Sequence, residues 1–191
     1  MFQLLTQEDY SSTPWKNGKG ITQDVLLLPA GASHDNFDIR VSIAPIVGEA
    51  PFSAFPGIER IITCLSDNPV ILVFADRNEV RLDRLMPFQF DSNLSPSTRL
   101  PEGEGRVLNV MTRRGRWNAS VKIINGGVDE VLEVPSGGLS VVHAARGDCR
   151  VAGLDVGAGQ SLVVRDVTEM PALVDEGCSI LVATIQPAHS R

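Results

Sequence analysis

The sequence of 191 residues has few of the side chains that most often carry enzyme chemistry. Its histidines are His34, His143 and His189, and they form no H-x-H pair followed by a glutamate and a third histidine. The histidine-rich sets that hold transition metals are therefore missing, and so is any Ser-His-Asp or Cys-His pattern. No phosphate-binding or dinucleotide-binding motif occurs either. We expect no metal, no cofactor and no catalytic residue, and we interpret each histidine as a surface or hydrogen-bonded side chain.

Cysteine, positive charge and long apolar runs are also scarce. The thiols Cys64, Cys149 and Cys178 are odd in number and contain no C-x-x-C pair, which predicts buried, reduced cysteines. No apolar run is long enough to span a bilayer, and Glu8 and Asp9 follow the N-terminus too closely for a signal peptide. The net charge of −6 disfavours nucleic acid and anionic membranes as partners. We therefore expect a cytoplasmic protein with a small-molecule or protein partner.

Short β-like segments, in contrast, recur along the whole chain. The clearest covers residues 37–43, where apolar residues alternate with polar ones and place Arg40 and Ser42 on one face. No helical period persists for ten residues, although Thr6-Gln7-Glu8-Asp9 resembles a capping box and predicts one or two helical turns. The pattern predicts a mainly β protein of antiparallel sheets with few short helices. We expect one unit over residues 1–191, built from β lobes at 1–115 and 116–191.

The stretch Pro14-Trp15-Lys16-Asn17-Gly18-Lys19-Gly20 concentrates binding chemistry in seven residues. It offers an aromatic surface, positive charge, an amide that both donates and accepts, and glycines that allow close approach of the backbone. The alternative is a tight turn between two β segments, with the tryptophan in the core and the lysines in water. A second compact loop at 51–57 contains two phenylalanines and a serine and leads directly into another β-like segment.

Four segments form a pattern in this order: the 14–20 stretch, R-V-S-I-A at 40–44, P-F-S-A-F-P-G-I-E-R at 51–60 and L-N-V-M-T-R-R at 108–114. Together they resemble the HutD/Ves family of bacterial bicupins. The resemblance is good over about the first 115 residues and implies a cupin-type double β-barrel or jelly roll. It also implies a regulator of histidine utilisation that binds an intermediate such as formylglutamate, formiminoglutamate or urocanate. Lys19 replaces a glycine of the family pattern, and Ile39 replaces a frequent aromatic residue.

The residues of these segments predict a binding site for a small anionic metabolite. Arg40 and Arg60 are competing candidates for a bidentate carboxylate clamp, and Lys16 would add a second charge. Amides would recognise the other end of the ligand, hydroxyls would donate hydrogen bonds, and an apolar wall would exclude water. These further groups are the amides of Asn17 and Asn109, the hydroxyls of Ser42 and Ser53, the wall residues Trp15, Phe52, Phe55 and Met111, and Gly18 and Gly20.

Three alternatives stay open. Arg40 and Arg60 would pair with acidic neighbours such as Glu59 or Asp38 across strands, leaving no charge for a ligand. A cofactor-free hydrolase or isomerase acting on such an intermediate would use Glu59 or Asp24 as a base. A structural or assembly protein would use the aromatic loops as an oligomer interface. A homodimer is a further alternative.

Overall fold

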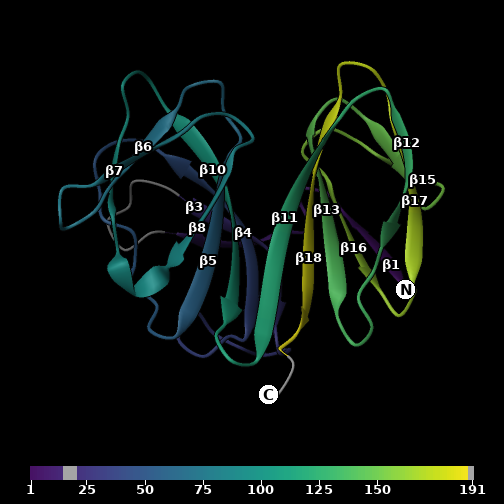
Figure 1. Cartoon of the computed structure of the whole chain (residues 1–191), viewed down its shortest axis with the longest axis horizontal. Coiled ribbons are helices and arrows are strands. Elements are labelled where there is room, and N and C mark those ends of the chain that lie inside the picture. Colours follow the sequence, from purple (N-terminus) through teal and green to yellow (C-terminus); the bar gives the residue numbers. More distant parts are fainter. Residues whose placement is uncertain (15–20, 189–191) are drawn as a thin grey trace. The chain divides into compact units, whose positions relative to one another are not determined.

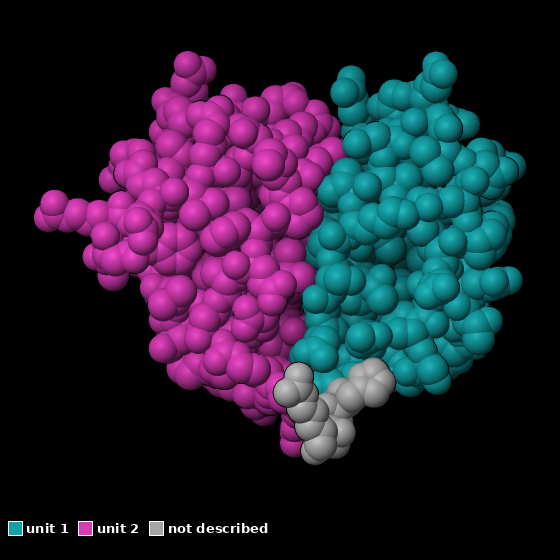
Figure 2. All heavy atoms as spheres, viewed as in Figure 1, with its two compact units in different colours: residues 1–10, 117–191 teal, residues 11–116 magenta. Residues whose placement is uncertain are grey.

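The computed structural model describes residues 1–14 and 21–188 of the chain. They form antiparallel β-strands joined by turns, with a short 3-10 helix, η1 (Ser92–Leu94) (Figure 1). The chain divides into two compact units: unit 2 is residues 11–116, and unit 1 combines residues 1–10 with residues 117–191 (Figure 2). Residues 1–10 thus belong with the C-terminal half and not with the expected 1–115 lobe, because β1 (Phe2–Leu5) pairs with β16 (Ser161–Arg165).

Unit 2 contains two antiparallel sheets. The larger has the strand order β2-β3-β4-β10-β5-β8 and the smaller the order β7-β6-β9. The larger sheet comprises β2 (Ser11–Pro14), β3 (Ile21–Leu28), β4 (Ile39–Ile46), β10 (Gly105–Arg113), β5 (Ile58–Cys64) and β8 (Pro87–Asp91). The smaller comprises β7 (Glu79–Leu82), β6 (Val70–Val73) and β9 (Ser97–Arg99).

One face of the larger sheet changes character along its length. Because side chains alternate along a strand, positions 40, 42, 44 and 46 of β4 share a face. At one end of this face, Ala44, Ile62 and Val107 pack with Val70 and Leu72 of the smaller sheet and form an apolar core. At the other end the same face presents polar side chains. The interior of unit 2 is therefore filled by apolar packing at one end of the sheet and lined by polar side chains at the other.

Unit 1 also contains two antiparallel sheets, with the orders β1-β16-β13-β18-β11 and β12-β17-β14-β15. Aliphatic side chains such as Val142, Leu162 and Ile180 from the first sheet pack with Val151 and Met170 from the second. This packing fills the interior between the sheets. The remaining strands are β13 (Leu139–Arg146), β18 (Ser179–Pro187), β11 (Trp117–Asn125), β12 (Val128–Glu133), β17 (Glu169–Val174), β14 (Cys149–Val151) and β15 (Leu154–Val156).

The prediction of a mainly β protein with antiparallel sheets is confirmed, but one local prediction is wrong. Residues 6–9 form a turn and not a helix: the Asp9 carboxylate accepts from the backbone N and the Oγ1 of Thr6, both at 2.8 Å. The flanking residues are held in β1 and β2, and the contacts between Thr6 and Asp9 close the connection between them as a turn. Among the described residues, no helix is long and apolar enough to cross a membrane.

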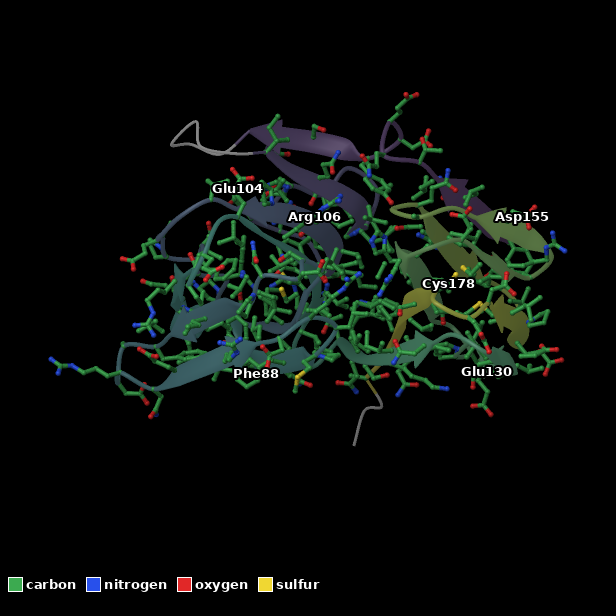
Figure 3. The ribbon with its side chains drawn as sticks, turned by 90° about the horizontal axis from the view of Figure 1, so that it is seen from above. Phe88, Glu104, Arg106, Glu130, Asp155 and Cys178 are labelled. Atoms are coloured by element: carbon green, nitrogen blue, oxygen red, sulfur yellow. The ribbon has the colours of Figure 1, made fainter. Side chains whose placement is uncertain are left out.

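The three thiols differ in their environments. All are free, and Cys64 and Cys149 are buried as predicted, but Cys178 is only half-buried. Cys178 is labelled in Figure 3. It follows the 175–177 turn, which carries its side chain to the edge of the unit 1 core. Burial, and secondarily the neighbouring Cys178 thiol, raise the pKa of Cys149 to about 11. Cys149 is therefore a thiol of low reactivity in the folded protein.

We expect Ellman's reagent to label Cys178 first in the native protein at pH 8. The raised pKa leaves Cys149 with roughly 100-fold less thiolate than an ordinary cysteine, and its burial slows access further. The measurement is the time course of thiol release, with all three thiols counted after denaturation. In Cys178→Ser the fast phase should disappear. A fast phase that survives this substitution would contradict the assignment.

Candidate ligand-binding cavity

A cavity of about 790 Å³ lies in unit 2, at the polar end of the larger sheet. Eight of the predicted site residues line it: Arg40, Ser42, Phe52, Ser53, Phe55, Arg60, Asn109 and Met111. The other five, Trp15, Lys16, Asn17, Gly18 and Gly20, lie outside the described residues, as does Lys19. The structure therefore brings together residues from three separate sequence segments, while their role in binding stays a prediction.

The register of three adjacent strands explains this convergence. Met111 of β10 lies opposite Arg40 of β4 on one side and opposite Arg60 of β5 on the other. In the next row of the same face, Asn109 lies opposite Ser42. Adjacent strands are about 4.8 Å apart, so the two arginines flank Met111 across one sheet face.

The aromatic loop is fixed over this face by backbone hydrogen bonds. Phe52 N donates to the Pro96 carbonyl at 3.0 Å, and Phe55 N donates to the Ser92 carbonyl at 3.3 Å. The Phe55 ring also meets Phe37 edge to face, with 5.5 Å between the ring centroids. Phe52 and Phe55 are partly buried, and their rings turn toward Arg60. The loop therefore forms a wall of the cavity.

Arg40 is neutralised by a carboxylate. Its Nε donates to Asp24 Oδ1 at 2.7 Å, and the two side chains are 7% and 3% exposed. The other oxygen of Asp24 lies 2.8 Å from His34 Nε2, so His34 is satisfied as expected. A turn in which Ser33 N donates to Asn36 Oδ1 at 2.7 Å positions this histidine. Arg40 thus brings a charge that is already paired.

Arg60 has no carboxylate partner among the described residues, although it is only 3% exposed. Its guanidinium carbon lies 5.0, 5.5 and 5.6 Å from the ring centroids of Phe52, Phe55 and Phe90. Nη2 donates to the Ser53 carbonyl at 3.2 Å, and Nε is buried without a hydrogen-bond partner among the described residues. Burial, and secondarily the charge of Arg40, lower the pKa of Arg60 to about 9, which still leaves it protonated at neutral pH.

The predicted acidic partners of these arginines lie elsewhere. Asp38 pairs with Arg113 at 2.9 Å and with Arg116 at 2.9 Å. Glu59 precedes Arg60 in β5 and so points to the opposite face, where its carboxylate lies 3.3 Å from Arg114. The named partners Glu59 and Asp38 are therefore wrong for the described residues. Pairing with an acidic neighbour across strands is nevertheless confirmed for Arg40, whose partner is Asp24, and not for Arg60.

Asn109 adds a second unsatisfied group. It is 4% exposed, and its Oδ1 is buried without a hydrogen-bond partner among the described residues. A buried polar atom in this state is costly unless another molecule supplies the missing hydrogen bond. We call the sheet face formed by Arg40, Ser42, Arg60, Asn109 and Met111 the inner wall of the cavity. Arg60 and Asn109 give this inner wall one unpaired positive charge and one amide oxygen that a ligand could satisfy.

Sequence reasoning missed the roles of three residues. The sequence presents Asp24 only as a possible base, it does not identify Asp24 as the partner of His34, and it does not link Phe90 to the site. Phe90 lies opposite Arg60 in the register of β5 and β8, which no local sequence pattern reveals. Among the residues described, no group of three potential metal ligands exists, and His34 Nε2 already contacts Asp24. These side chains therefore fit a transition-metal site poorly.

Comparison with solved structures defines the class of protein. The cupin 2 conserved barrel domain protein from Leptotrichia buccalis matches with a TM-score of 0.58 at 13% identity, covering 96% of each chain. HutD from Pseudomonas fluorescens SBW25, solved in a formate condition, matches with a TM-score of 0.83 at 24% identity, covering 99% of this chain and 100% of that chain. At these identities the matches establish the fold alone, and the fold is cupin-like.

The family follows from the sequence. The HutD family profile matches residues 7–182, so the chain belongs to the HutD family. Protein Ves from Citrobacter koseri (strain ATCC BAA-895) is 40% identical over 110 residues, which are 57% of this chain and 56% of that protein. The match thus spans little more than half the length of that relative. The resemblance found in the four sequence segments is confirmed.

Proposed function

We propose that the protein binds a small carboxylate-bearing metabolite in the cavity of unit 2 and acts through this binding, without turning the metabolite over. The observation that supports this most strongly is Arg60, a buried cation that has no carboxylate partner among the described residues. Such a charge is unfavourable until an anion accompanies it. A carboxylate suits a guanidinium because its two oxygens match the N–H geometry, and Asn109 would contact a polar group of the same ligand.

The proposed biological role is regulation of histidine utilisation in the cytoplasm. Membership of the HutD family supports this role, as does the name of the structurally similar HutD from Pseudomonas fluorescens. Formylglutamate, formiminoglutamate and urocanate are the proposed ligands, because each carries a carboxylate and a nitrogen-containing polar group. The inward-facing rings of Phe52 and Phe55 favour binding over the assembly alternative, which needs these rings on the outside.

One observation favours a second candidate, a cofactor-free enzyme acting on the same metabolites. His34 lines the cavity, its side chain is 31% exposed, and its Nε2 contacts the Asp24 carboxylate at 2.8 Å. A carboxylate that holds one ring nitrogen of a histidine orients the other nitrogen for proton transfer. In this reading Asp24 would position the histidine and would not itself be the base.

Titration calorimetry with the three metabolites, and with formate as the smallest carboxylate, tests the proposal. At least one metabolite should bind at one site per chain, and at 100 times its Kd it should stabilise the fold by about 2.7 kcal/mol. Mass spectrometry of the same mixtures after prolonged incubation should return the ligand unchanged, whereas conversion would favour the enzyme. The absence of binding by every carboxylate would contradict both candidates.

A further inference from the structure

Three arginines line the cavity, and among the described residues two of them are paired with carboxylates: Arg40 with Asp24 and Arg113 with Asp38. Arg40 and Arg60 belong to the same sheet face, one on either side of Met111. Arg40 is paired with Asp24, and both side chains of this pair are almost completely buried. Arg60 has no such partner among the described residues. Asp24 therefore decides whether Arg40 adds its positive charge to that of Arg60 on this sheet face.

Asp24 is fixed in this role by both of its oxygens. Oδ1 accepts from Arg40 Nε at 2.7 Å, and Oδ2 lies 2.8 Å from His34 Nε2. With each oxygen held from a different direction, the carboxylate cannot turn away to release Arg40 without breaking a second contact. Its position opposite Ser42 in the register of β3 and β4 places it on the cavity face. A second negative group on a ligand near Arg40 would thus also meet the charge of Asp24.

We propose that Asp24 is a specificity-determining residue, which neutralises Arg40 and so restricts the inner wall to ligands that bring one carboxylate to Arg60. This inference rests on the proposed function and refines it: the ligand class is one whose buried end is a single carboxylate beside an uncharged polar group. Any second carboxylate of the metabolite would lie outside the inner wall.

Succinamate and succinate test this proposal. They share a four-carbon skeleton and differ at pH 7.5 by one negative charge, so the ratio of their Kd values reports charge selectivity. The native protein should bind succinamate more tightly than succinate. In Asp24→Asn, the freed charge of Arg40 should shift the ratio toward succinate by at least about tenfold, as expected for two charges a few ångströms apart in a partly buried site.

The double variant Asp24→Asn/Arg40→Met separates this effect from general damage. It removes both charges of the pair, so the native preference for succinamate should return. If Asp24→Asn does not fold, the double variant still tests the proposal. Loss of succinamate binding in the folded double variant would show that this binding depends on Arg40, and that result would overturn the proposal. If Asp24→Asn still binds both probes with an unchanged ratio of Kd values, the role of Asp24 is refuted while the proposed carboxylate site stands. Native protein that binds neither probe would instead contradict the carboxylate site itself.

Discussion

Replacing Arg60 by methionine is expected to weaken carboxylate binding by at least about 30-fold, because removal of one partner from a buried charge pair typically costs 2–5 kcal/mol. Arg60 carries the uncompensated charge that we assign to the ligand, and Arg40 cannot substitute for it while Asp24 holds its Nε at 2.7 Å. The measurement is calorimetry with the tightest-binding metabolite, or with succinamate. Binding within threefold of the native value would contradict the central role of Arg60.

The same substitution should not destabilise the fold. The three phenylalanine rings around the guanidinium contribute cation–π attraction, about 0.5–2 kcal/mol for each favourable contact. Against this, the desolvation of the charge is penalised by several kcal/mol, as the lowered pKa of Arg60 also indicates. A methionine fills much of the same space and packs well against aromatic rings. We therefore expect Arg60→Met to raise the free energy of unfolding by about 1 kcal/mol.

Arg81→Met is the matched control. Arg81 also belongs to unit 2, but its side chain is 59% exposed and pairs with Asp83, which is 52% exposed. Its removal should leave binding unchanged and alter the free energy of unfolding by less than about 0.5 kcal/mol. A loss of stability in Arg60→Met, with binding lost only in proportion to unfolded protein, would indicate that Arg60 is a structural residue.

Replacing Asp24 by asparagine is expected to have the opposite consequence for stability. The substitution leaves Arg40 buried without its carboxylate, and the side chain of Arg40 is only 7% exposed. Breaking a buried ion pair by removing one partner typically costs 3–5 kcal/mol, so we expect a loss of about 3 kcal/mol. The hydrogen bond to His34 is also weakened, because a neutral amide accepts less strongly than a carboxylate.

Urea unfolding followed by intrinsic fluorescence measures this loss. Asp83→Asn removes an acid from an exposed pair and should change the free energy of unfolding by at most about 0.5 kcal/mol. Asp24→Asn/Arg40→Met should recover most of the lost stability, because Arg40 is then no longer left buried without its carboxylate. If Asp24→Asn is as mild as Asp83→Asn, the pair is not the buried, mutually dependent contact that its geometry indicates.

The two arginines look alike in the sequence, and only the structure separates them. Each lies in a β-like segment and belongs to a segment of the HutD pattern, at 40–44 and 51–60. Their difference arises from a carboxylate that lies 16 residues before Arg40 in the chain. Asp24 reaches Arg40 because β3 and β4 pair with a bulge between Asp24 and Leu26, and strand registers of this kind depend on the whole sheet.

The sequence by itself determined the β character of the chain, the shared face of Arg40 and Ser42, and the aromatic loop that precedes Arg60. These features depend on alternation and on the order of residues along one strand, both of which are local properties. The tertiary structure decided which arginine is neutralised and that residues 1–10 join unit 1. It also placed Phe90 beside Arg60. Each of these depends on which strands become neighbours and in which register, and that choice is made by packing between segments far apart in the chain.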